Sequence, residues 1–421
     1  MDKLFYRKGS VNKGKSLEED FQTFIDAVPQ AKLAVCGGIK MKKIAILLST
    51  IPQSGGEHQY LKLLVESLVL YDKSCFEVTA ICCNSFWSRW CRERHISRVQ
   101  YKMESYSMQA MRFNAFFPIL PFIYNRYKSE LEQIVRKNKI NILIIGQQGV
   151  FVPKLSCKVI QPVHDLMHRY EPQFMEIRDS YKEREETFSC GARCVDVVLA
   201  DSKLGMRQYK ECYCQKKQHR PRIRILPFVA QSYEGIKEES MDVPQKYIFY
   251  PAQFWEHKNH KNLILAIAML KKKLPEIHLI LVGSERNSLH KTVQLIRDNG
   301  LEDNVSIMGF VTDGQIVFLY RHATALVMPT YFGPTNIPPL EAMALGCPVI
   351  VSKKYAMGEQ VGEAGMLCDP DLPESIAECI EKVWCDEGLR KDMITKGYQQ
   401  SRKWTIQDFK KRFIKILNEE L

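Results

Sequence analysis

The stretch Pro329-Thr-Tyr-Phe-Gly-Pro-Thr-Asn-Ile-Pro-Pro-Leu-Glu-Ala-Met-Ala-Leu-Gly-Cys-Pro-Val-Ile-Val-Ser352 has the clearest structural pattern in the chain. It follows a short apolar run that ends at Met328, which is typical of a buried parallel strand. Glycine, proline and asparagine then predict a loop, and Pro338-Pro339 predicts the start of a helix, where proline removes no helical hydrogen bond. Because Pro348 to Ser352 is again apolar, the stretch predicts a strand–loop–helix–strand unit of a doubly wound α/β sheet.

Short apolar runs alternate with amphipathic segments along most of the remaining chain, which favours an α/β fold with parallel sheets. In the first half we expect a helix from Glu57 to about Val69 and strands over Lys42–Leu48, Val78–Cys82, Ile140–Ile145, Val159–Val163 and Val197–Ala200. In the second half we expect helices over Asn262–Lys272 and Leu340–Leu345 and strands over Tyr247–Tyr250, His278–Val282, Ala325–Met328 and Pro348–Ser352. The simplest architecture is two Rossmann-like doubly wound domains that face each other across a cleft.

The chain of 421 residues is too long for one ordinary hydrophobic core, so two domains are expected. A polar stretch that breaks the periodicity marks the linker between them. The predicted bounds are 1–40 for an N-terminal appendage with one helix (Leu17–Val28), 41–230 for the N-terminal domain, 231–246 for the linker, 247–400 for the C-terminal domain, and 401–421 for a C-terminal helix that packs back on the N-terminal domain.

The composition indicates a globular protein of a reducing compartment. Forty-five per cent of the residues are hydrophobic, and no stretch reaches the roughly 18 consecutive apolar residues of a membrane span. The N-terminus lacks the apolar region of a signal peptide, so we expect the 14 cysteines to be mostly buried thiols in the cytoplasm. The pairs Cys190/Cys194 and Cys212/Cys214 leave a zinc site as an alternative, although a C-x-C spacing fits zinc ligands poorly.

The net charge of +12 is unevenly distributed along the chain. Residues 1–230 carry 37 Lys and Arg against 23 Asp and Glu, a balance of +14, and the remaining residues have a balance of −2. A basic N-terminal half predicts an anionic partner, such as an acidic membrane surface, or else only a well-solvated surface. The apolar and aromatic segment Tyr106–Tyr127 is either a membrane-contacting surface or a loop that lines the core. Nucleic acid is not an expected partner, because the positive charges are dispersed and no recognition motif is present.

The loop and helix that follow Met328 predict an anion-binding site. Unpaired N–H groups at the start of a helix suit a diphosphate. Glu341 is expected in the first turn of this helix, where its carboxylate can accept two hydrogen bonds from a vicinal diol such as a nucleotide ribose. The alternative is that Glu341 only interacts favourably with the helix dipole.

With these residues the chain resembles the retaining GT-B glycosyltransferases of the family-four type, the group 1 glycosyltransferases, over most of its length. The family has two carboxylates separated by seven residues, the second in a run like PPLEAMA-x-G-x-P-V, which Pro338–Val349 matches closely. The resemblance assigns Glu341 to the ribose of a nucleotide-sugar donor. The chain departs from the family at Gly333, where the first carboxylate would contact the donor sugar. Either backbone amides around Asn336 and Ile337 take over, or the activity is altered. The donor-binding candidates in this loop are Gly333, Pro334, Thr335, Asn336 and Ile337.

The segment Tyr250–Asn262 resembles a second donor-binding element of the family, a strand and loop with an arginine and a lysine that neutralise the diphosphate. The resemblance places the lysine at Lys258. The arginine position holds Gln253, so Lys261 is a candidate for the missing charge. The alternative is that Lys258 is simply a solvated lysine in a polar loop.

Two elements of the N-terminal domain complete the resemblance. A His-Asp-Leu follows a strand there, and its histidine, His164, would approach the donor sugar. The alternative is a purely structural histidine, and we expect His168 nearby on the surface. Gly55 and Gly56 follow the first strand, where glycine lets a phosphate come close to the backbone.

The pair Asp369 and Asp371 mimics the metal-binding motif of a different glycosyltransferase fold. Because a proline at 373 and an amphipathic helix follow, a turn and a helix cap are the better interpretation. We therefore expect neither a metal nor another cofactor.

Together these motifs predict a retaining, metal-independent hexosyltransferase with Lys258, His164 and Glu341 as catalytic residues. It would move a sugar from a nucleotide-sugar donor in the C-terminal domain to a hydroxyl of a sugar or lipid-linked acceptor at the N-terminal domain. The resemblance and the basic charge suggest polysaccharide or lipopolysaccharide assembly at the inner face of a membrane. Two other functions stay open, namely a nucleotide-sugar epimerase of the same fold and a non-catalytic nucleotide-sugar-binding or membrane-surface scaffold protein.

Overall fold

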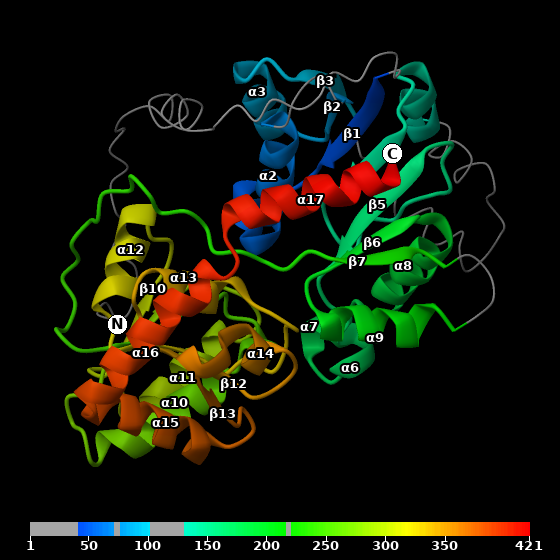
Figure 1. Ribbon diagram of the computed structural model, residues 1–421. Helices are drawn as coiled ribbons and strands as arrows, with labels where there is room; N and C mark the ends of the chain where they lie inside the picture. Colours follow the sequence, from blue (N-terminus) through cyan, green and yellow to red (C-terminus); the bar gives the residue numbers. More distant parts are fainter. Residues whose placement is uncertain (1–40, 71–75, 102–129, 216–219) are drawn as a thin grey trace.

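The computed structural model describes residues 41–70, 76–101, 130–215 and 220–421, which form two parallel sheets surrounded by helices (Figure 1). The predicted helix Leu17–Val28 and the segment Tyr106–Tyr127 lie outside the described residues. The first sheet comes from the N-terminal half of the chain and the second from the C-terminal half.

The N-terminal sheet has seven parallel strands in the order β3-β2-β1-β4-β5-β6-β7. In the centre of the sheet, Ile44 pairs with Val78 on one side and with Ile142 on the other. The strands are β1 (Lys42–Leu48), β2 (Phe76–Cys82), β3 (Ser97–Gln100), β4 (Ile142–Ile145), β5 (Lys158–Val163), β6 (Val197–Ala200) and β7 (Arg222–Ile225).

Both faces of this sheet are buried, which explains why its central strands are continuous apolar runs. Ile44 and Ile46 belong to the core on one face, whereas Ala45 and Leu47 belong to the core on the other. The helices of this half are α2 (Gly56–Val69), α3 (Ser85–Glu93), α6 (Met167–Tyr170), α7 (Met175–Arg178), α8 (Tyr181–Cys194) and α9 (Lys203–Tyr213), with a short 3-10 turn, η1 (Pro52–Ser54).

The C-terminal sheet has six parallel strands in the order β10-β9-β8-β11-β12-β13. They are β8 (Ile248–Pro251), β9 (Leu279–Val282), β10 (Val305–Met308), β11 (Ala325–Met328), β12 (Val349–Ser352) and β13 (Gly365–Cys368). The helices around them are α10 (His260–Lys271), α11 (Leu289–Asp298), α12 (Asp313–His322), α13 (Ile337–Ala344), α14 (Met357–Val361), α15 (Pro373–Cys385) and α16 (Glu387–Arg402), with 3-10 turns η2 (Glu256–Lys258) and η3 (Gly362–Ala364).

The chain passes between the two halves twice. Residues 226–247, which contain no helix or strand, lead from β7 to β8. After α16 the chain returns, and α17 (Ile406–Glu420) lies beside α2 on the N-terminal half (Figure 1). Phe409 and Phe413 of α17 are fully buried in the same core cluster as Ile44 and Ile46. The last helix therefore completes the core of the first domain.

The predicted α/β fold with two doubly wound parallel sheets is confirmed. Each predicted strand is present, with bounds that differ by at most two residues. Four strands, β3, β7, β10 and β13, were not predicted. They are the outer strands of their sheets, and exposed or half-buried positions replace the continuous apolar run that marks a central strand.

Candidate functional site: loops at the switch points of two facing sheets

Two topological switch points position the predicted site loops. The strand order reverses between β1 and β4 in one sheet and between β8 and β11 in the other. Ligands of doubly wound sheets bind beyond the carboxyl ends of the strands at such points. Gly55 and Gly56 follow β1, Lys258 follows β8, and the loop 333–337 follows β11. Three of the elements predicted from the sequence therefore lie where the topology favours a ligand.

Loops beyond the carboxyl ends of the two sheets contact each other directly. The Thr335 hydroxyl in the loop after β11 donates a hydrogen bond to Asp201 Oδ2, which directly follows β6. A Cβ atom on Gly56 would lie 3.2 Å from Ile337 Cδ1, so the starts of α2 and α13 are in close contact. Beside them an apolar cluster joins the two halves, formed by Met167, Phe174, Ile177 and Phe332.

Lys258 is held in place through its backbone and through the next residue. The buried Tyr250 of β8 donates its hydroxyl to the Lys258 carbonyl oxygen at 2.9 Å. Asn259 has a φ of 61°, in the left-handed region that asparagine tolerates better than most residues. Its side-chain amide donates to the Pro329 carbonyl oxygen at 2.9 Å, which ties the loop after β8 to the loop after β11.

In the described part of the chain, no carboxylate lies within 4.0 Å of the ammonium group of Lys258. The side chain is partly buried, and burial lowers its pKa to about 8 against an opposing influence of Asp165. A partly buried cation without a partner at a switch point is what an anionic ligand requires. Lys258 therefore has the properties that its predicted role demands.

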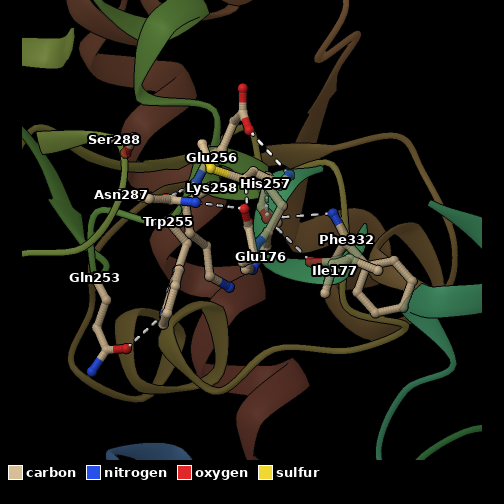
Figure 2. A network of polar contacts seen from close by, with 12 residues as sticks. Glu176, Ile177, Gln253, Trp255, Glu256, His257, Lys258, Asn287, Ser288 and Phe332 are labelled. Atoms are coloured by element: carbon tan, nitrogen blue, oxygen red, sulfur yellow. Dashed lines mark hydrogen bonds and ion pairs between the residues drawn. The ribbon is translucent and has the colours of Figure 1, made fainter. Parts of the chain in front are cut away.

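Gln253 does not reproduce the positive charge that the family resemblance implies at its position. Its side-chain oxygen accepts a hydrogen bond of 2.9 Å from the Trp255 indole N–H (Figure 2). The guanidinium carbon of Arg286, in the loop after β9, lies 5.2 Å from the centroid of the Trp255 ring. Lys261, the other candidate for the missing charge, is exposed on the first turn of α10.

A polar network around Glu176 joins the two halves next to Lys258 (Figure 2). Glu176, on the short helix α7, accepts hydrogen bonds at Oε1 from the backbone N–H of His257 at 3.1 Å and from its Nδ1 at 2.7 Å. Its other oxygen, Oε2, accepts a hydrogen bond of 2.8 Å from Asn287 Nδ2. Asn287 Oδ1 also accepts a hydrogen bond from the Glu256 backbone N–H at 3.1 Å. The Asn287 side chain therefore connects its own loop with the segments that contain Glu176 and Glu256.

Burial and these hydrogen bonds set opposite protonation preferences in the network. Burial alone would raise the pKa of Glu176, but the hydrogen bonds from His257 and Asn287 lower it to about 2. Burial lowers the pKa of His257 despite the hydrogen bond to Glu176. At neutral pH the pair is therefore an ionised carboxylate and a neutral imidazole that carries its proton on Nδ1.

Glu341 is buried and its two oxygens already have partners. Oε1 accepts a hydrogen bond from the Tyr233 hydroxyl and Oε2 one from the Tyr320 hydroxyl, both at 2.9 Å. Burial raises the pKa of Glu341, and these hydrogen bonds only partly offset the shift. The predicted position in the first turn of the helix is wrong. The helix α13 begins at Ile337, so Glu341 is one turn further in, and an interaction with the free end of the helix dipole cannot explain it.

The loop after β11 keeps a conformation that depends on Gly333. Its φ is 112°, and a Cβ atom there would lie 2.7 Å from Asn336 Nδ2. The predicted role of the Asn336 amide is also constrained, because its N–H donates to Gln360 Oε1 at 3.0 Å. Pro334 is buried and Ile337 half-buried against Gly56. An anion can accept hydrogen bonds only from those backbone N–H groups of this loop that do not already donate to an acceptor within the protein.

His164 is enclosed by aromatic rings. Its ring centroid lies 4.6 Å from that of Tyr60 and 4.9 Å from that of Phe228. Burial lowers the pKa of His164 to about 4, so the ring is neutral at pH 7. Nε2 is buried without a hydrogen-bond partner among the described residues. The next residue, Asp165, forms an ion pair with Arg184, which keeps its pKa low although burial alone would raise it.

Two expectations about neighbouring residues are wrong. His168 is not on the surface but fully buried, stacked on Phe188 and hydrogen-bonded through Nε2 to the Tyr213 hydroxyl at 2.8 Å. Asp369 forms the expected turn, since its Oδ1 accepts from the Asp371 N–H at 3.0 Å, but it caps no helix. The residue before α15 is Leu372, which makes no side-chain cap.

The cysteine pair Cys190/Cys194 lies in α8 with the two sulfur atoms 3.8 Å apart. Cys212 lies near the Tyr170 hydroxyl, with the sulfur and oxygen atoms 3.8 Å apart. No group of three or more His, Cys, Asp or Glu side chains that could hold a metal ion occurs among the described residues.

Sequence reasoning missed three residues of this region, namely Asp201, Glu176 and Tyr233. Asp201 had a usable signal, because it directly follows the predicted strand Val197–Ala200 at the carboxyl end where ligands bind. Glu176 and Tyr233 had none. They lie in a four-residue helix and in the polar linker, and only the packing of the two halves brings them to His257 and Glu341.

The fold belongs to the GT-B class. It has two Rossmann-like parallel sheets whose carboxyl ends face each other, and the loops predicted to bind the donor lie at their switch points. The family resemblance is confirmed for the C-terminal half of the chain, because residues 234–400 match the family model described as glycosyl transferases group 1.

Similar proteins agree with this class. The O-antigen chain mannosyltransferase B of Escherichia coli is 26% identical over 162 residues, which are 38% of this chain and 42% of that protein. The match therefore spans less than half the length of this relative. Sucrose-phosphate synthase of Thermosynechococcus elongatus has a TM-score of 0.68 at 16% identity, over 90% of this chain and 98% of its own. HepE of Anabaena, solved in complex with UDP-glucose, has a TM-score of 0.63 at 15% identity, over 90% and 99%. At these identities the two structures show the fold alone.

Proposed function

We propose that the protein is a retaining glycosyltransferase that transfers a sugar from a nucleoside diphosphate sugar to a hydroxyl acceptor. One observation carries this proposal more than any other. Lys258 presents a partly buried ammonium group, without a carboxylate partner among the described residues, at the switch point of the C-terminal sheet. The family match of residues 234–400, which contain Lys258 and Glu341, supports it.

The proposed chemistry uses Lys258 to stabilise the leaving group. As the bond between the anomeric carbon and the diphosphate breaks, negative charge builds up on the phosphate oxygens. A fixed cation in a site shielded from water stabilises this charge more than water does. The free amides of the loop 333–337 and the turn at Gly55 and Gly56 would contribute in the same way. Glu341 would hold the ribose, and His164 would lie toward the sugar.

Retention of the anomeric configuration is part of the proposal. No pair of carboxylates can be assigned as nucleophile and acid–base as in a retaining glycosidase. We therefore propose that the departing phosphate assists deprotonation of the acceptor on the same face of the sugar, without a metal. The N-terminal half would hold the acceptor, and contact between the halves would exclude water that hydrolyses the donor.

The proposed acceptors are sugar or lipid-linked molecules of surface polysaccharide or lipopolysaccharide assembly at the cytoplasmic face of a membrane. A relative named for the O-antigen chain supports this proposal. Arg89, Arg92 and Arg98 are exposed on α3 and β3 of the basic half, where they could meet anionic lipid. None of the described helices has the length and apolar character to cross a bilayer. Co-sedimentation with anionic vesicles but not with neutral ones tests the contact.

A donor panel tests the proposed activity. The full-length protein is titrated with UDP-, GDP-, ADP- and dTDP-sugars, with and without EDTA, and binding and released nucleoside diphosphate are measured. A mannose donor is included because of the relative named a mannosyltransferase. We expect one donor class to bind and turn over regardless of EDTA, with retained anomeric configuration in the product.

Two variants and one control make this test specific. Lys258→Ala and Glu341→Ala should each weaken donor binding by about tenfold or more, because each removes a charged partner of the ligand. The matched control is Lys272→Ala, which removes an exposed lysine at the opposite end of α10 and should leave binding unchanged. If no nucleotide sugar binds to the wild-type protein, the proposed function is wrong. Binding without turnover would favour the non-catalytic alternative.

A further inference from the structure

We propose that Asp201 is a sugar-binding residue of the donor site, whose carboxylate reaches the loop 333–337 from the opposite domain and accepts hydrogen bonds from hydroxyls of the donor sugar. This inference rests on the proposed function and adds to it a specific residue of the N-terminal half. It identifies the group that recognises the sugar, as distinct from the groups that recognise the nucleoside diphosphate.

The loop 333–337 itself cannot supply a carboxylate. Residues 329–337 contain no Asp or Glu. At Gly333 the φ of 112° and the predicted contact of 2.7 Å between a Cβ atom and Asn336 Nδ2 exclude an acidic side chain without a rearrangement of the backbone. A carboxylate that faces a sugar beside this loop must therefore come from elsewhere in the molecule.

Asp201 lies in a position from which it reaches this loop. Asp201 directly follows β6, at the carboxyl end of the N-terminal sheet. Its Oδ2 accepts a hydrogen bond from Thr335, two residues after Gly333. Among the described residues, it is the carboxylate that is hydrogen-bonded to this loop. Asp201 thus lies on the side of the domain interface opposite Lys258 and Glu341, which both come from the C-terminal half.

The side-chain partners of Asp201 suit a ligand rich in hydroxyl groups. Asp201 is 2% exposed, yet no Lys, Arg or His lies within 4.0 Å of it in the described part of the chain. The side chains that donate to it do so through hydroxyl groups, those of Thr335 and of Ser202 at 3.0 Å. A buried carboxylate without a cation is costly, and such groups are concentrated at functional sites. A carboxylate whose side-chain partners are hydroxyl groups is suited to a ligand that presents hydroxyl groups.

The Asp201 carboxylate can accept hydrogen bonds from further partners. A carboxylate has about four acceptor positions, of which the two hydroxyl groups use two and the backbone N–H of Asp201 uses a third. The bond from Thr335 spans the two halves of the molecule, so separation of the halves uncovers Oδ2 for a ligand. Burial in the closed arrangement also raises the pKa of Asp201 to about 7. A hydroxyl-rich ligand would relieve this strain on the charged form.

The test separates recognition of the sugar from recognition of the nucleoside diphosphate. Two probe pairs are used, UDP with UDP-glucose and GDP with GDP-mannose, and the Kd of each is measured by calorimetry at pH 8. For the pair that binds, Asp201→Asn should leave the Kd of the nucleoside diphosphate within about twofold of wild type. It should weaken binding of the nucleotide sugar by about tenfold, because a hydrogen bond to a charged group is lost.

Ser202→Ala is the control, because it removes a hydroxyl partner of Asp201 and keeps the carboxylate. It should retain the affinity for the nucleotide sugar, whereas Glu341→Ala should weaken both members of the pair. Binding of the nucleoside diphosphate reports that Asp201→Asn and Ser202→Ala are folded. Equal weakening of both members by Asp201→Asn, or no effect on either, overturns the proposal, as does a Ser202→Ala variant that behaves like Asp201→Asn. If the wild-type protein binds neither pair, the nucleotide sugar that binds in the donor panel and its nucleoside diphosphate replace them; if no nucleotide sugar of that panel binds, the proposed function fails first and the inference with it.

Discussion

At the scale of single residues, the environment of Lys258 makes its charge depend on pH in the physiological range. Burial lowers its pKa to about 8, and the described residues provide no carboxylate within 4.0 Å to counter this. A bound diphosphate would supply that counter-charge and favour the protonated form. The affinity for nucleoside diphosphate should therefore be constant below about pH 7 and decrease above pH 8.

This pH dependence is measurable by titration of the nucleoside diphosphate between pH 6.5 and 9.5. We expect Kd to rise by up to about tenfold per pH unit once the free lysine is neutral. The Lys258→Arg variant is the control, because a guanidinium group stays charged over this range and the rise should disappear. An equal rise in both proteins would show that another group is responsible.

The pKa of Asp201 gives a second prediction, about stability. The pKa of Asp201 is about 7 in the folded protein, whereas the ordinary pKa of an aspartate is 3.8, so the folded protein binds the proton more tightly than the unfolded chain does. Ionised Asp201 destabilises the folded protein. This destabilisation is absent below about pH 4, grows as the pH rises from 4 to 7, and is complete above pH 7. Asp201→Asn should thus be more stable than wild type at pH 8, by on the order of a few kcal/mol, and nearly equal at pH 4.

Thermal or denaturant unfolding of the two proteins at both pH values checks this difference. A variant that is more stable but recognises the sugar less well is the expected signature of a residue kept for function. Lower stability of Asp201→Asn at pH 8 would indicate instead that the ionised carboxylate stabilises the domain interface.

At the scale of elements, the linker connects the two domains and also forms hydrogen bonds with side chains of both. Tyr233, within the predicted linker 231–246, donates its hydroxyl to Glu341 Oε1 at 2.9 Å. Gln231, close by, accepts a hydrogen bond from Gln59 of α2 at 2.6 Å. The linker therefore contacts the start of the N-terminal domain and the carboxylate that is proposed to bind ribose.

If ribose uses Glu341 Oε1, the Tyr233 hydroxyl competes with it. Tyr233→Phe removes this competitor and keeps the ring, so we expect the affinity for nucleoside diphosphate to increase by several-fold. Calorimetric titration of both proteins measures the change. Tyr320→Phe serves for comparison, since it also removes a hydrogen bond to Glu341 but from the core of the domain, and should mainly lower stability by about 1–3 kcal/mol. Weaker binding by Tyr233→Phe would mean that the hydroxyl orients Glu341 for the ligand.

At the scale of the whole molecule, the two halves are joined by two chain crossings and by the network around Glu176. Glu176 receives hydrogen bonds from His257 and Asn287 of the other half, and its pKa is lowered to about 2. A carboxyl group with a lowered pKa stabilises the closed arrangement above its ordinary pKa of 4.5 and loses this effect as pH falls toward 2. The network is therefore intact at neutral pH.

Loss of this network should open the molecule. Glu176→Ala leaves His257 Nδ1 and Asn287 Nδ2 without their acceptor, so we expect a larger radius of gyration in small-angle X-ray scattering at pH 7. Donor turnover should fall with it, because closure positions Lys258 beside the other half. Glu183→Ala, which removes an exposed glutamate from α8 of the same domain, is the control and should change neither. An unchanged radius in Glu176→Ala would show that the other contacts between the halves, among them the apolar cluster around Phe332, are sufficient to hold them together.

The fold could be predicted from the sequence to a large extent. Central parallel strands are buried on both faces, so their apolar runs are visible without knowledge of their neighbours, as in Val197–Ala200 and Ala325–Met328. The outer strands β3, β7, β10 and β13 could not be found in this way, because one side of each has no neighbouring strand and polar residues are tolerated there. Lys258, Glu341 and Gly333 were predicted as site residues from local motifs, and their roles stay predictions.

What the sequence determined by itself is the pair of doubly wound sheets and the loops beyond their strands, because strand and loop signals are local in the chain. Only the tertiary structure decided which side chains meet across the two halves. Asp201 and Thr335 are 134 positions apart, Tyr233 and Glu341 108, and Glu176 and His257 81. Such pairs form only when one domain packs on the other. Because the two segments are distant in the chain, neither of them carries a periodic pattern that would reveal the contact.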